Sequence, residues 1–311
     1  MIANFFNNAK PLNSVIFLVT LVCFFVLAQF NIDFKPFTIE LLTLKLGSLL
    51  ILATLFFVYR FVINRNKLTL INSYALLFIC LSLGLFYTAL ADFKVLISQL
   101  FLALAFRRIY SLRSSLNIKE KLFDSSFLIA ISSLFFFENS YFMILVYVAL
   151  FVFIRSNWYY FIIPVIGFLV PYFLIYIYAL GTDSFSYFDK ITAVSFSFNL
   201  GILSHIKFLV IIDILFLTAL IGYIRNTLKT TEFSNEFRAL WELILAHFIL
   251  ATFLVFTSNS FGIEKGLYII FPFGIIMANY LQTIEKKVLK ELIVIGFLCL
   301  TLGSIIYNFV P

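Results

Sequence analysis

Charged residues are scarce in this chain of 311 residues, because Asp, Glu, Lys and Arg make up only 12% of it. A soluble domain carries about twice that share. Hydrophobic residues account for 63% of the chain, and that much apolar surface would be exposed and aggregate in water. A bilayer core of ~30 Å takes about 20 apolar residues per helix. We therefore expect an all-α, polytopic integral membrane protein with about eleven transmembrane helices.

Cysteine is also scarce, and the usual catalytic motifs are missing. Cys23, Cys80 and Cys299 each stand alone in an apolar run, which argues against a disulfide framework and against a zinc site. The chain has no Walker motif, GxSxG elbow, HExxH helix or Gly-rich nucleotide loop, so ATP-driven pumping and soluble-type hydrolysis are poorly supported. The sequence identifies no cofactor and no metal ligands, and it leaves open whether a divalent ion is needed.

Apolar runs follow one another along the whole chain. We expect a single transmembrane domain over 1–311, with a short interfacial segment at 1–11 that ends at Pro11, a favourable residue for a helix start. The predicted spans are 12–31, 43–63, 69–90, 94–110, 125–137, 140–154, 158–180, 203–224, 240–258, 266–283 and 289–309.

Lys and Arg residues are sorted between alternate gaps: sixteen of the 22 fall in every second gap and six in the others. Because short loops rich in Lys and Arg stay cytoplasmic, this sorting predicts an N-terminus in the cytoplasm and a C-terminus on the outer side, which is the periplasm if the protein is in the bacterial inner membrane, as the family resemblance below implies. The net charge of +7 is thus spread over helix ends, which indicates membrane lipids as partners and argues against nucleic acid.

Three segments depart from plain spans. Residues 110–124 have an amphipathic helical pattern and are predicted to form a helix on the cytoplasmic surface. The spans within 125–154 are short, so we expect a helical hairpin that stops below the outer surface, with Glu138 and Asn139 at its tip. Residues 181–202 form the longest outer loop, in which Ser alternates with aromatic residues such as Phe185 and Tyr187.

Ionisable residues at membrane depth are functional candidates by default. Asp213 lies about halfway along its predicted span, and His247 lies at a similar depth in the next one. An antiparallel pair of helices would bring the two side chains together. The pair then acts either as a proton or substrate relay, because His changes charge near neutral pH, or as a buried link between two helices.

Glu138 and the Arg107–Arg108 pair are the other candidates. Burial of Glu138 in a recess suits a general acid or base, whereas the alternative is a turn residue whose neighbours Asn139 or Ser140 cap the next helix. Arg107 and Arg108 either satisfy the positive-inside rule alone or bind a lipid phosphate, for which the guanidinium is well suited.

Two family resemblances accompany these residues. The stretches MIANFFNNAKPLNS, FRRIYSLRSSLNIKEKLFDSSFLIAISSLFFFENSYFMILVYVALFVF and RSNWYYFIIPVIGFLVPYF resemble an uncharacterised family of multipass inner-membrane proteins from Bacteroidota. The stretch SSFLIAISSLFFFENSYFMILVYVALF is similar to the short helix pair of the GT-C glycosyltransferases, which use polyprenyl-phosphate-linked sugars. The second resemblance implies an acidic base in the first outer loop, where Asp33 and Glu40 lie.

Three functions follow as hypotheses. The first is a GT-C-like glycosyltransferase acting on lipid-linked sugars in envelope biogenesis, with Glu138, Asp33 and Glu40 as acid or base candidates. In that enzyme Arg107 and Arg108 would contact the lipid phosphate, and Phe185 and Tyr187 would form a sugar platform. The second is a transporter or lipid flippase coupled through Asp213 and His247. The third is a non-catalytic subunit of an envelope complex. The first is favoured, because outer acidic residues and a short hairpin coincide.

Overall fold

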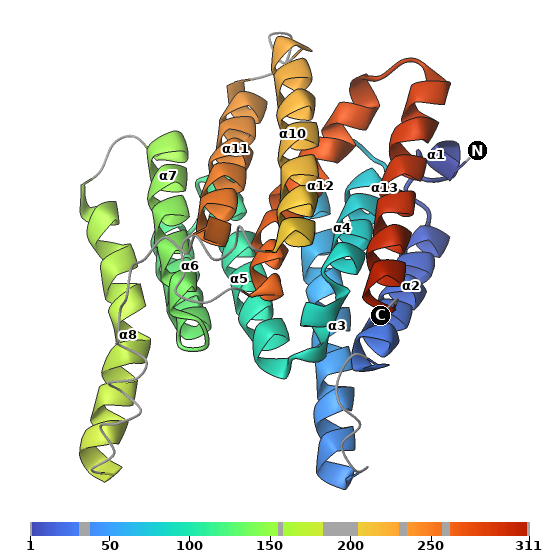
Figure 1. Cartoon of the computed structure of the whole chain (residues 1–311). Coiled ribbons are helices and arrows are strands. Elements are labelled where there is room, and N and C mark those ends of the chain that lie inside the picture. Colours follow the sequence, from blue (N-terminus) through green and yellow to red (C-terminus); the bar gives the residue numbers. More distant parts are fainter. Residues whose placement is uncertain are drawn as a thin grey trace. The chain divides into compact units, whose positions relative to one another are not determined.

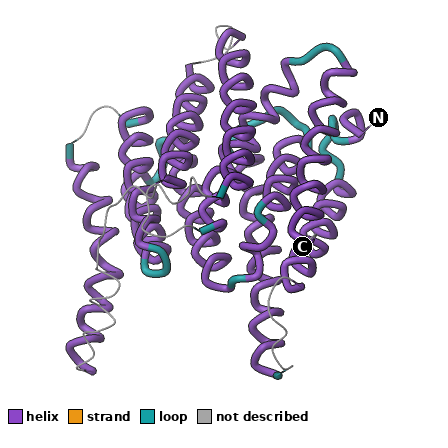
Figure 2. Tube along the Cα trace, viewed as in Figure 1, coloured by secondary structure: helices purple, strands orange, loops and turns teal. Residues whose placement is uncertain are grey.

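A computed structural model describes residues 2–30, 38–154, 158–182, 205–229, 235–256 and 262–309. Within these ranges the chain forms only helices and connecting loops, as Figure 2 shows, which confirms the all-α prediction. The chain divides into two compact units. Unit 1 comprises Met1–Phe93, Gly201–Phe233 and Gly262–Pro311, and unit 2 comprises Lys94–Leu200 and Ser234–Phe261.

Eight of the described helices are long and apolar enough to cross a membrane, which makes the chain an all-helical membrane protein. They are α2 (Pro11–Phe30), α3 (Ile39–Arg65), α5 (Phe93–Ser111) with η2 (Leu112–Ser114), α8 (Tyr159–Thr182), α10 (Ile206–Lys229), α11 (Asn235–Phe256), η6 (Ile263–Gly266) with α12 (Leu267–Thr283), and α13 (Lys287–Phe309). The shorter elements are α1 (Ile2–Phe5), α4 (Tyr74–Leu85), η1 (Tyr87–Ala91), α6 (Ile118–Ser133), η3 (Phe137–Phe142) and α7 (Met143–Phe153).

In unit 1 the core is built on α4 and α12. Every residue of α4 is buried, and α4 packs against α2, α12 and α13 (Figure 1). Gly274 allows α12 to approach α4 closely, because a Cβ at this position would lie 2.5 Å from Ile79 Cγ1. Polar side chains join the same helices: Thr301 Oγ1 donates to Leu81 O at 3.2 Å. Small residues and interhelical hydrogen bonds are what hold helices together in lipid, where burial from water gives no advantage.

The predicted interfacial segment at 1–11 belongs to unit 1, where its helix α1 packs against α13. The backbone N–H groups of Ile2 and Ala3 donate to the Glu291 carboxylate of α13, at 2.6 and 2.9 Å. The Tyr74 hydroxyl at the start of α4 donates to Ala3 O at 2.9 Å. The segment ends where α2 begins at Pro11, whose missing N–H costs nothing in the first turn.

In unit 2 the closest packing is that of α6 against α8. Gly167 of α8 faces α6, and a Cβ at this position would lie 2.2 Å from Ser126 Oγ and 2.7 Å from Phe123 O. Ser133 Oγ and the Tyr172 hydroxyl lie 2.8 Å apart across the same interface. Element η3 and helix α7 then return along α6, so the predicted hairpin forms with a 3-10 turn at its tip.

Residues 110–124 do not form the single surface helix expected from their amphipathic pattern. Helix α5 and η2 extend to Ser114, the chain turns, and α6 begins at Ile118. The turn places Ser115 and Asn117 in the left-handed region, each with φ near 51°, which interrupts a right-handed helix. The second half of the amphipathic segment is therefore the first part of the hairpin helix α6.

Candidate functional site

The hairpin tip in unit 2 is fixed by a buried polar cluster. Asn139 Nδ2 donates to Ser98 Oγ of α5 and to Ser132 Oγ of α6, both at 2.7 Å. Ser132 Oγ in turn donates to Ser98 O at 2.9 Å. All three residues are buried, and in the described part of the chain Asn139 Oδ1 has no hydrogen-bond partner. A buried amide acceptor of this kind needs a water molecule or a ligand group to satisfy it.

Glu138 lies next to this anchor in η3 and is half-buried. Because the Asn139 side chain is tied to two helices, the backbone at position 138 is held in place instead of moving as a free loop. A half-buried carboxylate on a fixed turn keeps contact with solvent and with a substrate, as a general acid or base requires.

The alternative in which Asn139 or Ser140 caps the following helix is wrong. Neither η3 nor α7 has a side-chain hydrogen bond at its N-cap, which is Phe136 for η3 and Phe142 for α7. The amide of Asn139 is used instead to join α5 and α6. Ser98 and Ser132 were not predicted from the sequence, although one signal was present: α6 carries two Ser-Ser pairs seven residues apart, which lie on one helix face.

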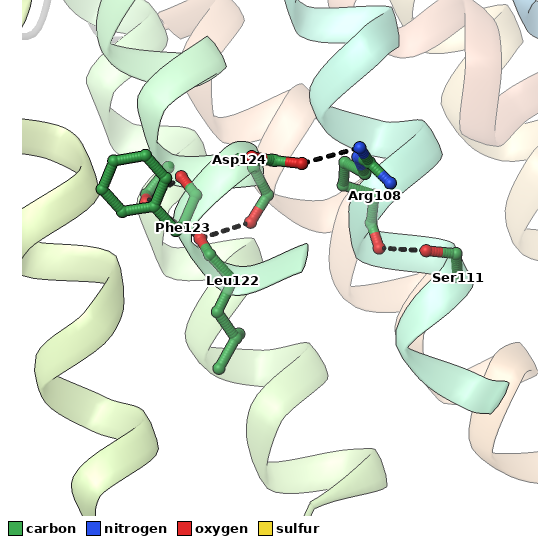
Figure 3. A network of polar contacts seen from close by, with 7 residues as sticks. Arg108, Ser111, Leu122, Phe123 and Asp124 are labelled. Atoms are coloured by element: carbon green, nitrogen blue, oxygen red, sulfur yellow. Dashed lines mark hydrogen bonds and ion pairs between the residues drawn. The ribbon is translucent and has the colours of Figure 1, made fainter. Parts of the chain in front are cut away.

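At the other end of α6 an ion pair closes the turn from α5. Arg108 Nη2 lies 2.7 Å from Asp124 Oδ2, and Ser111 Oγ donates to Arg108 O at 2.8 Å (Figure 3). Both charged side chains are more than a third exposed, so water screens the pair and its contribution to stability is small. A lipid phosphate at Arg108 would compete with Asp124 for the guanidinium, whereas Arg107 is exposed.

Lys121 is buried beside this ion pair. Its Nζ donates to Ser111 O and to Ser114 Oγ, both at 2.7 Å. Burial, and then the positive charge of Arg108, lower the pKa of Lys121. The ammonium group thus holds the α5–η2 end against α6 and belongs to the structure of the turn.

His247 lies in the core of unit 2 and is fully buried. The Tyr110 hydroxyl lies 3.1 Å from His247 Nδ1, and the ring of Phe106 lies 4.3 Å from the His247 ring, centroid to centroid. Phe142, at the end of η3, meets the His247 ring edge-on at 5.7 Å. The imidazole therefore joins α11 to α5 and to the hairpin within unit 2.

The remaining predicted residues belong to unit 1 or lie outside the described residues. Asp213 is exposed on α10 of unit 1, whereas His247 belongs to unit 2, and their pairing stays a prediction. Glu40 is exposed in the first turn of α3, which begins after the N-cap Thr38. Asp33, Phe185, Tyr187 and the loop 181–202 beyond Thr182 lie outside the described residues.

Over the described ranges no group of three or more His, Cys, Asp or Glu residues could hold a metal ion. Comparison of the chain with family models, with curated proteins and with solved structures finds no match. The resemblances to the Bacteroidota family and to the GT-C glycosyltransferases therefore stay predictions. What the helices define is the class: an all-helical membrane protein with a polar, anchored hairpin in one of its two units.

Proposed function

We propose that the protein is a GT-C-like glycosyltransferase of the bacterial inner membrane, acting on a polyprenyl-phosphate-linked sugar, with Glu138 as its general acid or base. The observation that carries this proposal is the anchored hairpin tip: Asn139 binds Ser98 and Ser132, and Glu138 is left half-buried beside it. Neither a relay through Asp213 and His247 nor a non-catalytic subunit would need a half-buried carboxylate on a fixed turn.

The proposed topology has about eleven crossings, with the N-terminus in the cytoplasm and the C-terminus in the periplasm. In this arrangement the hairpin tip faces the outer side, where lipid-linked sugars are used. Arg107 then lies at the inner face and is a candidate contact for anionic lipid. Asp33 and Glu40 are alternative bases in the first outer loop.

The proposal is tested by purifying the wild-type protein and the Glu138→Gln variant from native membranes and identifying bound lipids by mass spectrometry. We expect the variant to retain sugar-linked polyprenyl phosphate, because its amide binds the substrate and cannot transfer a proton. The wild type should carry the sugar-free product lipid in a larger share.

Glu120→Gln is the matched control, since Glu120 is an exposed acidic residue in the first turn of α6, at the opposite end of this helix from the hairpin tip. It should show the wild-type lipid profile. Identical profiles in wild type and Glu138→Gln would exclude Glu138 as the acid or base. Absence of any polyprenyl lipid, together with a stably bound partner protein, would favour a non-catalytic subunit.

A further inference from the structure

Helix α10 has two faces of different character. One face is buried and packs on α12 of the same unit; it contains Phe208, Ile211, Ile212, Leu215, Ala219 and Gly222. At Gly222 the approach is close, because a Cβ there would lie 3.1 Å from Tyr280 Cβ. This face accounts for the packing of α10 within unit 1.

The opposite face is exposed along the whole helix and has a carboxylate in it. Its members recur every three or four residues: Ile206, Val210, Asp213, Leu217, Leu220 and Ile224. Successive residues of a helix are about 100° apart, so Asp213 points about 200° away from the buried Leu215. Within the described residues no ion pair or hydrogen bond reaches the Asp213 carboxylate.

A carboxylate among apolar side chains, roughly 10 Å from the nearer end of the helix, is costly in lipid. An opposite charge on a neighbouring helix offsets much of that cost. We propose that the exposed face of α10 is the docking site of a partner transmembrane helix that carries a Lys or Arg side chain opposite Asp213. The apolar residues of the face supply packing, and the carboxylate supplies specificity.

A second copy of the chain is the poorer source of such a cation. It would bring a like charge from its own Asp213, and in the described helices its Lys and Arg residues lie closer to a helix end than Asp213 does. Lys45 is the furthest from a helix end, six positions after the first residue of α3, against seven positions for Asp213 in α10. Charge complementarity therefore points to a different polypeptide. This inference is independent of the role proposed for Glu138.

The test uses the full chain in lipid vesicles and synthetic transmembrane helices of Leu and Ala as probes. Three probes carry one Lys, in the outer third, the middle or the inner third, and a fourth carries Leu only. Energy transfer between labelled protein and labelled probe measures association. We expect one of the Lys probes to bind about tenfold more tightly than the Leu probe, since polar contacts between membrane helices are of this strength.

Variants decide whether Asp213 is responsible. Asp213→Leu should abolish the preference for the Lys probe, and Asp213→Glu should keep it. Glu242→Leu is the control, because Glu242 is an exposed acidic residue on another helix, and it should leave the preference unchanged. Equal binding of all four probes to wild type, or the same preference in Asp213→Leu, would overturn the proposal. So would a Lys preference that is lost in Glu242→Leu.

The thermal midpoint of Asp213→Leu separates loss of a docking site from loss of the fold. An exposed carboxylate without a partner in its own chain should be replaceable by Leu with the midpoint unchanged or raised. A marked fall would mean that Asp213 binds within its own chain, as in the predicted pair with His247, and the docking proposal would fail. If Asp213→Leu does not fold, Asp213→Asn serves instead, with a reduced Lys preference expected.

Discussion

At the residue scale, the amide of Asn139 holds the hairpin tip of unit 2 against α5 and α6. Replacing Asn139 by Ala removes the amide donor shared by Ser98 Oγ and Ser132 Oγ in a buried site, although these hydroxyls keep their contact with each other at 3.2 Å. We expect Asn139→Ala to lower the free energy of unfolding by about 1–2 kcal/mol, the range for a buried interhelical hydrogen bond. The thermal midpoint of the purified protein in detergent measures this loss.

Ser140→Ala is the matched control for this change, because Ser140 is the adjacent polar residue and caps neither η3 nor α7. Its midpoint should equal that of the wild type. Equal midpoints for Asn139→Ala and Ser140→Ala would mean that the cluster does not anchor the tip. The activity proposed for Glu138 would then lose its structural support.

The residues at the tip were predictable and their partners were not. Glu138 and Asn139 stand out in the sequence because they are polar residues between two short apolar runs. Ser98 is 41 positions away from Asn139, in another helix, and serines are common enough that no local pattern connects the two. The same limit applies to His247, whose hydrogen-bond partner Tyr110 is 137 positions away.

At the element scale, the packing of α6 on α8 depends on the missing side chain at Gly167. We expect Gly167→Ala to destabilise the protein by about 1–3 kcal/mol, because the new methyl group overlaps Ser126 Oγ and the backbone at Phe123. The overlap with backbone atoms cannot be relieved by rotating a side chain. Thermal unfolding in detergent again gives the measurement.

Gly181 provides the comparison on the same helix, since a Cβ there meets nothing within 4 Å. Gly181→Ala should leave stability unchanged or raise it slightly, because Ala favours the helical conformation. A fall of similar size in both variants would attribute the effect to helix α8 itself and not to its contact with α6.

The positions of the helices can be predicted from the apolar runs of the sequence, whereas the places where a helix is interrupted depend on the backbone conformation of single residues. Predicted spans such as 12–31 and 158–180 correspond to α2 and α8, because an apolar run in lipid can satisfy its backbone only as a helix. The break at Ser115 and Asn117 was not expected, since Leu112, Leu116 and Lys119 keep the helical period across it. Periodicity records which side chains share a face, and it does not record a single residue with positive φ.

At the scale of the whole molecule, the sidedness of every candidate residue depends on the charge sorting. One unnoticed crossing would invert everything that follows it along the chain. The short elements α4, α6 and α7 are where such an error would arise, because they are below the length that guarantees a crossing. Orientation must therefore be measured on both sides of α4, and two exposed apolar residues allow this.

Single cysteines at Ile39 and Leu116 report the two sides, in a chain whose Cys23, Cys80 and Cys299 are replaced by Ser or Ala. Ile39 is 82% exposed at the start of α3, and Leu116 is 70% exposed in the turn before α6. In a bacterial expression host with a permeabilised outer membrane, the proposed topology predicts that a membrane-impermeant maleimide labels Ile39→Cys and spares Leu116→Cys. Lysing the cells should make Leu116→Cys reactive, because only the inner membrane protects it. Labelling of both positions in intact cells would mean that an odd number of crossings has been misassigned between them, and Glu138 would then face the cytoplasm.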